Sequence, residues 1–284
     1  MVHNPRKNLC GLFLALLVTP LLVNAADSMK PEELIARHLE SIGSPDARTS
    51  KTRVFQGTAT YRIVVGGGGQ TDGKSGLVSE GKKVRFMTKF PLTDYRGENA
   101  AFNGNSVRVA FSNSNQSRSP LASFLATYDV ILRDGLFGSV LSTAWPLEDI
   151  SERKPKLVYE GIKKLDGKPV HQLRYFSHKG SDVEIVLFFD TETFRHVKTL
   201  YRVEVANNVG KTILESAHLK SDRNSLEERF SDFKVVDGLT LPTHWNLQYT
   251  RELPDGSTTI SEWDLQGTDI SNNMTLDPKN FEIK

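Results

Sequence analysis

A hydropathy period of two residues runs through most of this chain and constrains its fold more than any other feature. From about Val54 onward, apolar and polar residues alternate in stretches such as 59–65 and 241–249. Such alternation is typical of strands that bury one face and expose the other. Turn dipeptides separate these stretches: Asn103-Gly104, Asp166-Gly167, Asp237-Gly238 and Asp255-Gly256. Because strands and helices do not alternate regularly, the pattern predicts an antiparallel meander rather than a parallel sheet.

Two regions with helical spacing interrupt the strands. The first covers residues 30–42 and ends before Gly43. The second covers residues 119–134, and a shorter stretch with the same spacing, residues 136–145, follows Gly135. The sequence therefore predicts an α+β fold that is mainly β, with a strongly curved antiparallel sheet and helices that cover its concave face.

Residues 1–25 have the organisation of a cleavable secretory signal peptide. A short basic region precedes an apolar run over residues 9–23, and small residues precede a cleavage point after Ala25. The apolar run has about 15 residues, whereas about 20 are needed to span a bilayer. We therefore expect export to the periplasm and a mature chain, residues 26–284, that forms a single domain.

The charges of the chain argue against nucleic-acid binding. The chain has 36 Lys and Arg residues and 34 Asp and Glu residues, and removal of Arg6 and Lys7 with the leader would leave 34 of each sign. Contact with phosphates requires a concentrated basic face instead. The single cysteine, Cys10, also lies in the leader, so the mature protein is expected to have no disulfide and no thiol chemistry.

The sequence has none of the common catalytic or metal-binding signatures. It contains no His-Glu-x-x-His, Gly-x-Ser-x-Gly or EF-hand pattern and no dinucleotide fingerprint. The histidines of the mature chain are scattered, with His171 and His178 as the nearest pair, and we expect His38 at the surface or rim of the first helix. We predict no catalytic residue, no metal and no cofactor. A hydrolase whose site is assembled from distant residues is the third-ranked alternative.

Four short segments and their order along the chain resemble one protein family. The segments are Ile42-Gly43 at the end of the first helix, Gly-Lys-Lys-Val-Arg-Phe at 81–86, the turn Phe102-Asn103-Gly104, and Val-Asp-Gly-Leu-Thr-Leu-Pro at 236–242. With the signal peptide and the mid-chain helix pair, they resemble the periplasmic lipoprotein-sorting proteins of the LolA/LolB type and the related RseB/MucB regulators. The resemblance implies an unclosed antiparallel half-barrel whose hollow is covered by helices and binds acyl chains.

The resemblance also suggests a polar contact to the covering helices. In LolA an arginine followed by proline, before a strand, holds the cover. Here the matching region contains no proline, and Arg85 is the candidate for that contact. The chain is longer than the lipoprotein carriers, so we carry over apolar-ligand binding in general rather than strict lipoprotein transport.

The leading hypothesis is a non-enzymatic, monomeric carrier or sensor that binds lipid or lipidated protein in an apolar cavity under the helices. The second is an interaction module without a cavity that presents its sheet to an envelope protein partner. An alternative for each proposed lining residue is that it belongs to the ordinary core. The expected lining residues are Phe86 and Phe90 from the sheet and Phe124, Leu125, Tyr128, Leu132, Phe137, Leu141 and Trp145 from the helical regions.

Overall fold

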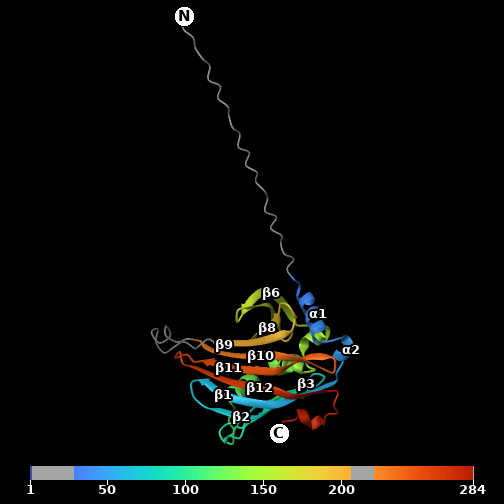
Figure 1. The fold of residues 1–284 in the computed structure, drawn as a ribbon. Coiled ribbons are helices and arrows are strands. Elements are labelled where there is room, and N and C mark those ends of the chain that lie inside the picture. Colours follow the sequence, from blue (N-terminus) through green and yellow to red (C-terminus); the bar gives the residue numbers. More distant parts are fainter. Residues whose placement is uncertain (2–28, 206–220, 284) are drawn as a thin grey trace.

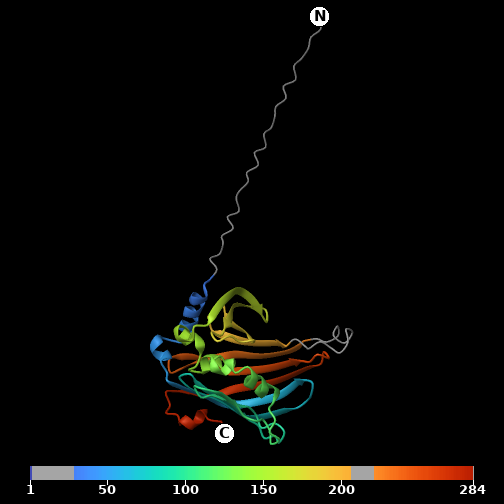
Figure 2. The same ribbon diagram turned by 180° about the vertical axis from the view of Figure 1, so that it is seen from behind.

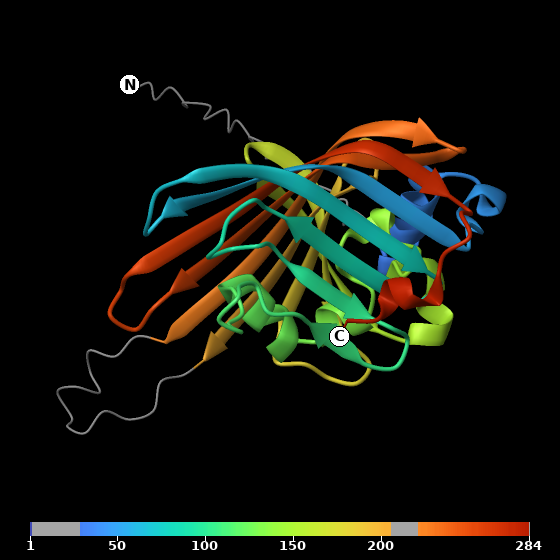
Figure 3. The ribbon, with the colours of Figure 1, turned by 90° about the horizontal axis from the view of Figure 1, so that it is seen from below.

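In the part of the chain that the structure describes, twelve antiparallel strands form a single sheet. The sheet is strongly curved and not closed (Figures 1 and 3). The computed structural model describes Met1 and residues 29–205 and 221–283. The predicted signal peptide, residues 1–25 with Cys10, lies outside the described residues. The curved, open sheet confirms the unclosed antiparallel half-barrel that the sequence predicts.

The strands follow one another across the sheet in the order β5-β4-β3-β2-β1-β12-β11-β10-β9-β8-β7-β6. β1 pairs with both β2 and β12 in the middle of the sheet, so the early and late parts of the chain meet there. β5 and β6 form the two edges. The strands are β1 (Thr52–Val65), β2 (Gln70–Glu80), β3 (Lys83–Lys89), β4 (Asn99–Phe102), β5 (Val107–Val109), β6 (Lys156–Leu165), β7 (Lys168–Phe176), β8 (Glu184–Asp190), β9 (His196–Val205), β10 (Asp222–Val236), β11 (Leu239–Glu252) and β12 (Thr258–Asn272).

The position of the helices follows from the strand order. Because β5 and β6 lie at opposite edges, the chain between them must cross the sheet, and it does so over the concave face (Figure 2). We call residues 120–153 the covering segment. Its elements are α3 (Pro120–Thr127), α4 (Val130–Arg133), the 3-10 turns η1 (Ser139–Leu141) and η2 (Pro146–Asp149), and α5 (Ile150–Arg153).

The covering segment is less helical than the sequence predicts. Tyr128 leaves the helical conformation and separates α3 from α4. The predicted helix over residues 136–145 is wrong, because only the turn η1 forms there. Gly135 and Gly138 have φ angles of +72° and +81°, and a Cβ at Gly135 would lie 2.0 Å from the Ala144 carbonyl oxygen. These two left-handed residues end the helical hydrogen bonding and fold the chain tightly back on itself.

The helix α1 (Pro31–Ile42) forms as predicted and packs at one end of the sheet. Pro31 opens it, and two glutamates in its first turn complement the positive end of the helix dipole. Gly43 ends it with φ +155°, and a Cβ there would lie 2.6 Å from the Gly238 carbonyl oxygen. This close approach joins the end of α1 to the β10–β11 turn. The short helices α2 (Pro45–Arg48) and η3 (Pro278–Phe281) complete the described elements.

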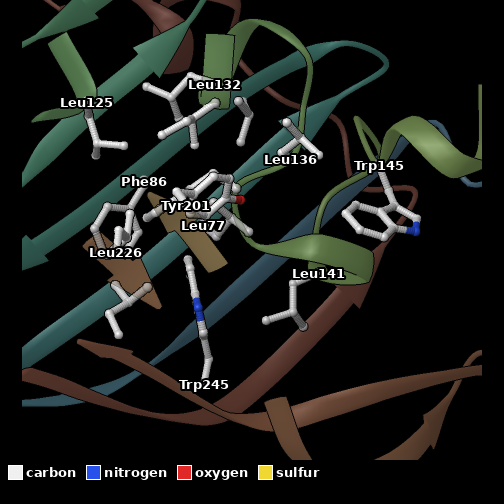
Figure 4. Close-up of a cluster of buried hydrophobic side chains, with 14 of the residues drawn as sticks. Leu77, Phe86, Leu125, Leu132, Leu136, Leu141, Trp145, Tyr201, Leu226 and Trp245 are labelled. Carbon is white, nitrogen blue, oxygen red and sulfur yellow. The ribbon is translucent and has the colours of Figure 1, made fainter. Parts of the chain in front are cut away.

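The hydrophobic core lies between the concave face of the sheet and the covering segment. Figure 4 shows Leu77, Phe86 and Trp245 from the sheet together with Leu132, Leu136 and Leu141 from the cover. The Trp245 ring is 5.2–6.3 Å, centroid to centroid, from four aromatic rings: Phe55, Phe86, Phe137 and Phe230. Aromatic contacts of this kind add to the large apolar area that each ring buries.

Candidate functional site

The structure brings the nine predicted lining residues together in one cluster between the sheet and the cover. Tyr128 is half-buried and packs against the cluster, whereas each of the other eight is less than 5% exposed. Their side chains occupy the concave interior themselves. The eight buried residues are Phe86, Phe90, Phe124, Leu125, Leu132, Phe137, Leu141 and Trp145.

A pocket of about 350 Å³ remains at the α3 end of the cover, and we call it the inner pocket. Of the predicted lining residues, Phe124 and Tyr128 contribute to it. The Phe124 ring lies 5.0 Å from the Tyr128 ring and 5.5 Å from the Tyr249 ring, centroid to centroid. The Tyr249 hydroxyl donates to Asn224 Oδ1 at 2.8 Å. The remaining lining residues are Arg118, Pro120, Ser123, Thr127 and Arg251.

The part of the cover from Gly138 to Trp145 is attached to the rest of the protein by five buried side chains, which we call the anchors: His38, Arg53, Ser79, His196 and Glu228. Each anchor is at most 1% exposed. They come from α1, β1, β2, β9 and β10 respectively. Each makes a hydrogen bond to a residue between Gly138 and Trp145, where the covering segment has little regular structure of its own.

Three anchors bond to the backbone of the cover. Glu228 Oε2 accepts from the Gly138 amide at 2.9 Å, and Ser79 Oγ accepts from the Thr143 amide at 2.9 Å. Arg53 donates through Nη1 to the Val140 carbonyl and through Nε to Asn272 Oδ1 at 2.9 Å. Buried backbone groups without such partners would carry a full desolvation cost, so these contacts allow an irregular segment to lie inside the protein.

The two histidine anchors bond to side chains of the cover. The Trp145 indole donates to His38 Nε2 at 3.1 Å. His196 Nδ1 lies 2.6 Å from Ser139 Oγ. Complete burial lowers the pKa of His38 to about 4 and lowers the pKa of His196 well below its usual value. Both rings are therefore neutral at pH 7.

Glu228 is uncharged at neutral pH as well. Burial raises its pKa to about 8, although hydrogen bonds from Tyr201 and from the Gly138 amide oppose the shift. The Tyr201 hydroxyl lies 2.6 Å from Glu228 Oε1. Neutral groups cost far less to bury than charged ones. Arg53 is thus the one anchor that carries a charge at pH 7.

The structure corrects two expectations from the sequence, one about Arg85 and one about His38. Arg85 points away from the cover: it donates to Asn99 Oδ1 at 2.9 Å and to the Asn280 carbonyl at 3.0 Å. Its neighbours on β3, Val84 and Phe86, take the inward positions, so the alternation of the strand turns Arg85 outward. The arginine that bonds the cover is Arg53. His38, expected at the surface, is fully buried.

A Ser-His-Asp chain that sequence analysis did not find lies on the outer face of the sheet. Ser231 Oγ is 2.9 Å from His244 Nδ1, and His244 Nε2 contacts Asp264. Ser231 on β10 is directly opposite His244 on β11, whereas Asp264 on β12 is opposite Asn246 and lies diagonally from His244. The side chains of His244 and Asp264 are 29% and 50% exposed. Acyl transfer by such a chain needs amide donors in a water-excluding cleft, whereas here β11 is hydrogen-bonded on both sides and the side chains face water.

The structure offers no evident site for a metal ion and no membrane-spanning helix within the described ranges. Among residues 29–205 and 221–283, no three His, Cys, Asp or Glu side chains are grouped to hold a metal. In the same part of the chain, no helix has the length and apolar character needed to cross a membrane.

No protein family model matches the chain, and no curated protein matches it. Among solved structures, it is similar to a LolA superfamily protein from Nitrosomonas europaea, with 15% identity, coverage of 90% of this chain and 99% of that chain, and a TM-score of 0.48. A DUF1329 family protein from Desulfovibrio piger has 14% identity, coverage of 88% and 96%, and a TM-score of 0.40. A chain of the Pseudomonas aeruginosa MucA/MucB complex has 11% identity, coverage of 86% and 99%, and a TM-score of 0.23. The names LolA and MucB are those of the families that the sequence resembles.

Proposed function

We propose that the mature chain is a non-enzymatic carrier or sensor of the periplasm that binds an acyl chain of a lipid or lipidated protein. The acyl chain would lie against the concave face of the sheet when the covering segment moves away. One observation carries this proposal: side-chain anchors, rather than strand pairing, attach the cover over an apolar face.

The energies involved allow such an exchange. A net hydrogen bond contributes about 1 kcal/mol, so the five anchors together contribute about 5 kcal/mol. Burial of one CH₂ group contributes about 0.8 kcal/mol, so roughly seven such groups offset the anchors. An ordinary acyl chain is longer than that. The condition is that the apolar side chains of the cover pack onto the acyl chain, so that their own burial is retained.

The inner pocket is the place where an acyl chain would first enter. It is open to solvent at the α3 end, and its apolar walls include Phe124 and Tyr128, which the sequence also selects. From there the concave surface continues through Leu125 toward Phe86 (Figure 4). The site therefore offers an entry that exists before the cover moves.

Binding of a fluorescent fatty acid to mature wild-type protein and two pocket variants tests this proposal. Phe124→Asn places a polar group in the wall, and Ser123→Trp fills the pocket from an exposed position without removing a core side chain. We expect both to weaken binding at least about tenfold, which is about 1.4 kcal/mol. The matched control is Val235→Asn, at a residue 73% exposed on β10, which should bind like wild type.

Circular dichroism would establish that each variant retains its sheet. Absence of binding to the wild type, or equal affinity in Ser123→Trp, would contradict the proposal.

The second candidate is an interaction module of the cell envelope that has no ligand cavity. The observation that favours it is the packing of eight predicted lining residues as core. Native mass spectrometry of protein purified without detergent separates the two candidates. A bound acyl species supports the carrier or sensor. A ligand-free mass that added lipid does not change supports the module.

A further inference from the structure

A second hollow lies on the opposite, convex side of the sheet. It is a groove of about 530 Å³ between the outward side chains of β1–β3 and the C-terminal segment, residues 273–282. We call it the outer groove. Its apolar surface comes from Val54, Val78, Met87, Met274 and Leu276.

The C-terminal segment is fixed at both of its own ends, on β1 and on β3. At one end the Asn273 amide donates to the Thr52 carbonyl at 2.9 Å, and Thr52 Oγ1 donates to the Met274 carbonyl at 2.7 Å. At the other end, Arg85 donates to the Asn280 carbonyl at 3.0 Å, and Phe281 is 2% exposed. The residues between these ends pass over the sheet as a strap, visible near the C-terminus in Figure 3.

A glycine creates the hollow in the floor. Gly76 on β2 faces outward and is directly opposite Gln56 on β1 and Met87 on β3. A Cβ at Gly76 would have the Phe55 carbonyl oxygen at 3.6 Å and Met87 Cε at 3.9 Å, both ordinary contacts. A side chain would therefore fit at Gly76 without strain and would fill the groove. Its absence is what keeps the groove open.

Two lysines stand at one end of the groove. Lys74 on β2 and Lys89 on β3 are direct cross-strand partners, and both line the groove. Like charges at opposed positions repel each other. Among the described ranges, neither lysine takes part in an ion pair. The carboxylate that lines the groove, Asp269, lies on β12, two strands from β2, and accepts from Ser271 Oγ at 3.1 Å.

We infer that the outer groove is a second binding site, for an amphiphile with one aliphatic chain and an anionic head. The chain would lie against Val54, Met87 and Leu276, and the head would contact Lys74 and Lys89. An anion between the two ammonium groups turns their repulsion into two charge-assisted contacts. The two methionines suit such a site because their flexible side chains adapt to a ligand's shape. This site is on the other face from the one proposed above and does not depend on it.

The test is titration of the mature protein with dodecanoate, with native mass spectrometry to count bound equivalents and calorimetry to measure affinity. Gly76→Leu should lower the number of bound dodecanoate molecules by one. Lys74→Gln/Lys89→Gln should lower the affinity for that dodecanoate molecule at least about tenfold. Lys163→Gln/Lys164→Gln is the matched control, because it removes the same charge from two exposed lysines of β6. Dodecanol, which has the same chain and a neutral head, should bind this site at least about tenfold more weakly.

Several outcomes would overturn the inference. They are an unchanged number of equivalents in Gly76→Leu, equal affinity in the Lys74/Lys89 variant and its control, or equal binding of dodecanol. If Gly76→Leu fails to fold, the lysine variants decide, because both side chains are exposed. Inner-pocket variants separate the two sites: Ser123→Trp should leave the Gly76-dependent equivalent in place whether or not the concave face binds an acyl chain.

Discussion

Polar side chains on the two faces of the sheet differ in burial and in charge. Under residues 138–145 of the cover, the polar groups of the concave side are few, fully buried and mostly uncharged, and they bond to the covering segment. On the convex face, charged side chains form ladders across the strands: Arg174 lies 2.9 Å from Glu160 and 3.3 Å from Glu184, and Arg202 lies 3.1 Å from Glu184. The same residue alternation supplies both faces. The environment decides whether a polar group stays charged.

This difference indicates where the proposed movement of the cover would act. Exposed ion pairs contribute little and are replaced by water at small cost. The buried anchors are few, and each determines whether a backbone or side-chain group of the cover has a partner. The inner face therefore holds a small number of contacts on which the position of the cover depends.

Trp245→Ala should cause the largest loss of stability. The residue is fully buried and lies among four aromatic rings, so truncation should lower the free energy of unfolding by about 3–5 kcal/mol. Phe188→Ala is the matched change on the convex face, where the ring is 9% exposed in a small cluster with Val186 and Leu200. Urea denaturation should show a clearly smaller loss for Phe188→Ala. Equal losses would break the contrast between the faces.

Arg53→Met should release the cover without unfolding the sheet. The Val140 carbonyl would lose its partner, and the free energy of unfolding should fall by about 2–3 kcal/mol. Hydrogen exchange should become faster in residues 138–145 and remain slow in β11. Arg85→Met is the control, since Arg85 bonds the C-terminal segment instead. Faster exchange of the cover in Arg85→Met, and not in Arg53→Met, would show that the anchor is misassigned.

Because of Glu228, the free energy of unfolding should fall as the pH rises. The pKa of Glu228 is about 8 in the folded state against 4.5 ordinarily, so its contribution is complete below pH 4.5 and is lost as the pH rises through about 8. Between about pH 6.5 and 8, histidines of the unfolded state lose most of their remaining protons, and this raises the free energy of unfolding slightly because His38 and His196 are neutral in the folded state. In that window the wild type should lose about 2 kcal/mol of stability through Glu228.

Denaturation curves at several pH values would measure this loss. Glu228→Gln, which keeps an acceptor for the Gly138 amide, should lack this loss, and its stability should rise slightly between pH 6.5 and 8 as His38 and His196, buried in the folded state, deprotonate in the unfolded state. Parallel profiles for the variant and the wild type would mean that Glu228 does not titrate there.

Arg174→Gln should have the smallest effect. Its side chain is 36% exposed, and its ion pairs with Glu160 and Glu184 face solvent, so the loss should be below about 1 kcal/mol. Added salt should reduce the difference from wild type further. A loss as large as that of Arg53→Met would mean that the convex ladder, and not the anchors, controls stability.

Strand positions were predictable from the sequence, because alternation and turn dipeptides are local signals. The pairing of β1 with β12 and the crossing of the cover between the two edges were not, because they join residues far apart in the chain. The helix over residues 136–145 was predicted wrongly, since apolar spacing does not reveal that Gly135 and Gly138 take left-handed conformations.

The sequence contains a local signal for the anchors that was not used: their position within the hydropathy period of the helix or strand. His38 is four residues from both Leu34 and Ile42, on the buried stripe of α1. Arg53 is in phase with Phe55, and Glu228 lies between Leu226 and Phe230 on the inward side of β10. Each is a polar residue at a position where the period requires an apolar one. Their partners in the cover, however, are visible only in three dimensions.

Hydrogen exchange with and without a saturating fatty acid tests the central claim most directly, namely that the cover yields its place to an acyl chain. The amides of Gly138 and Thr143, which bond Glu228 and Ser79, report on the anchors. We predict that ligand speeds exchange at residues 138–145 while β11 stays protected. Unchanged protection of these amides, with the fatty acid bound in the inner pocket, would contradict the claim.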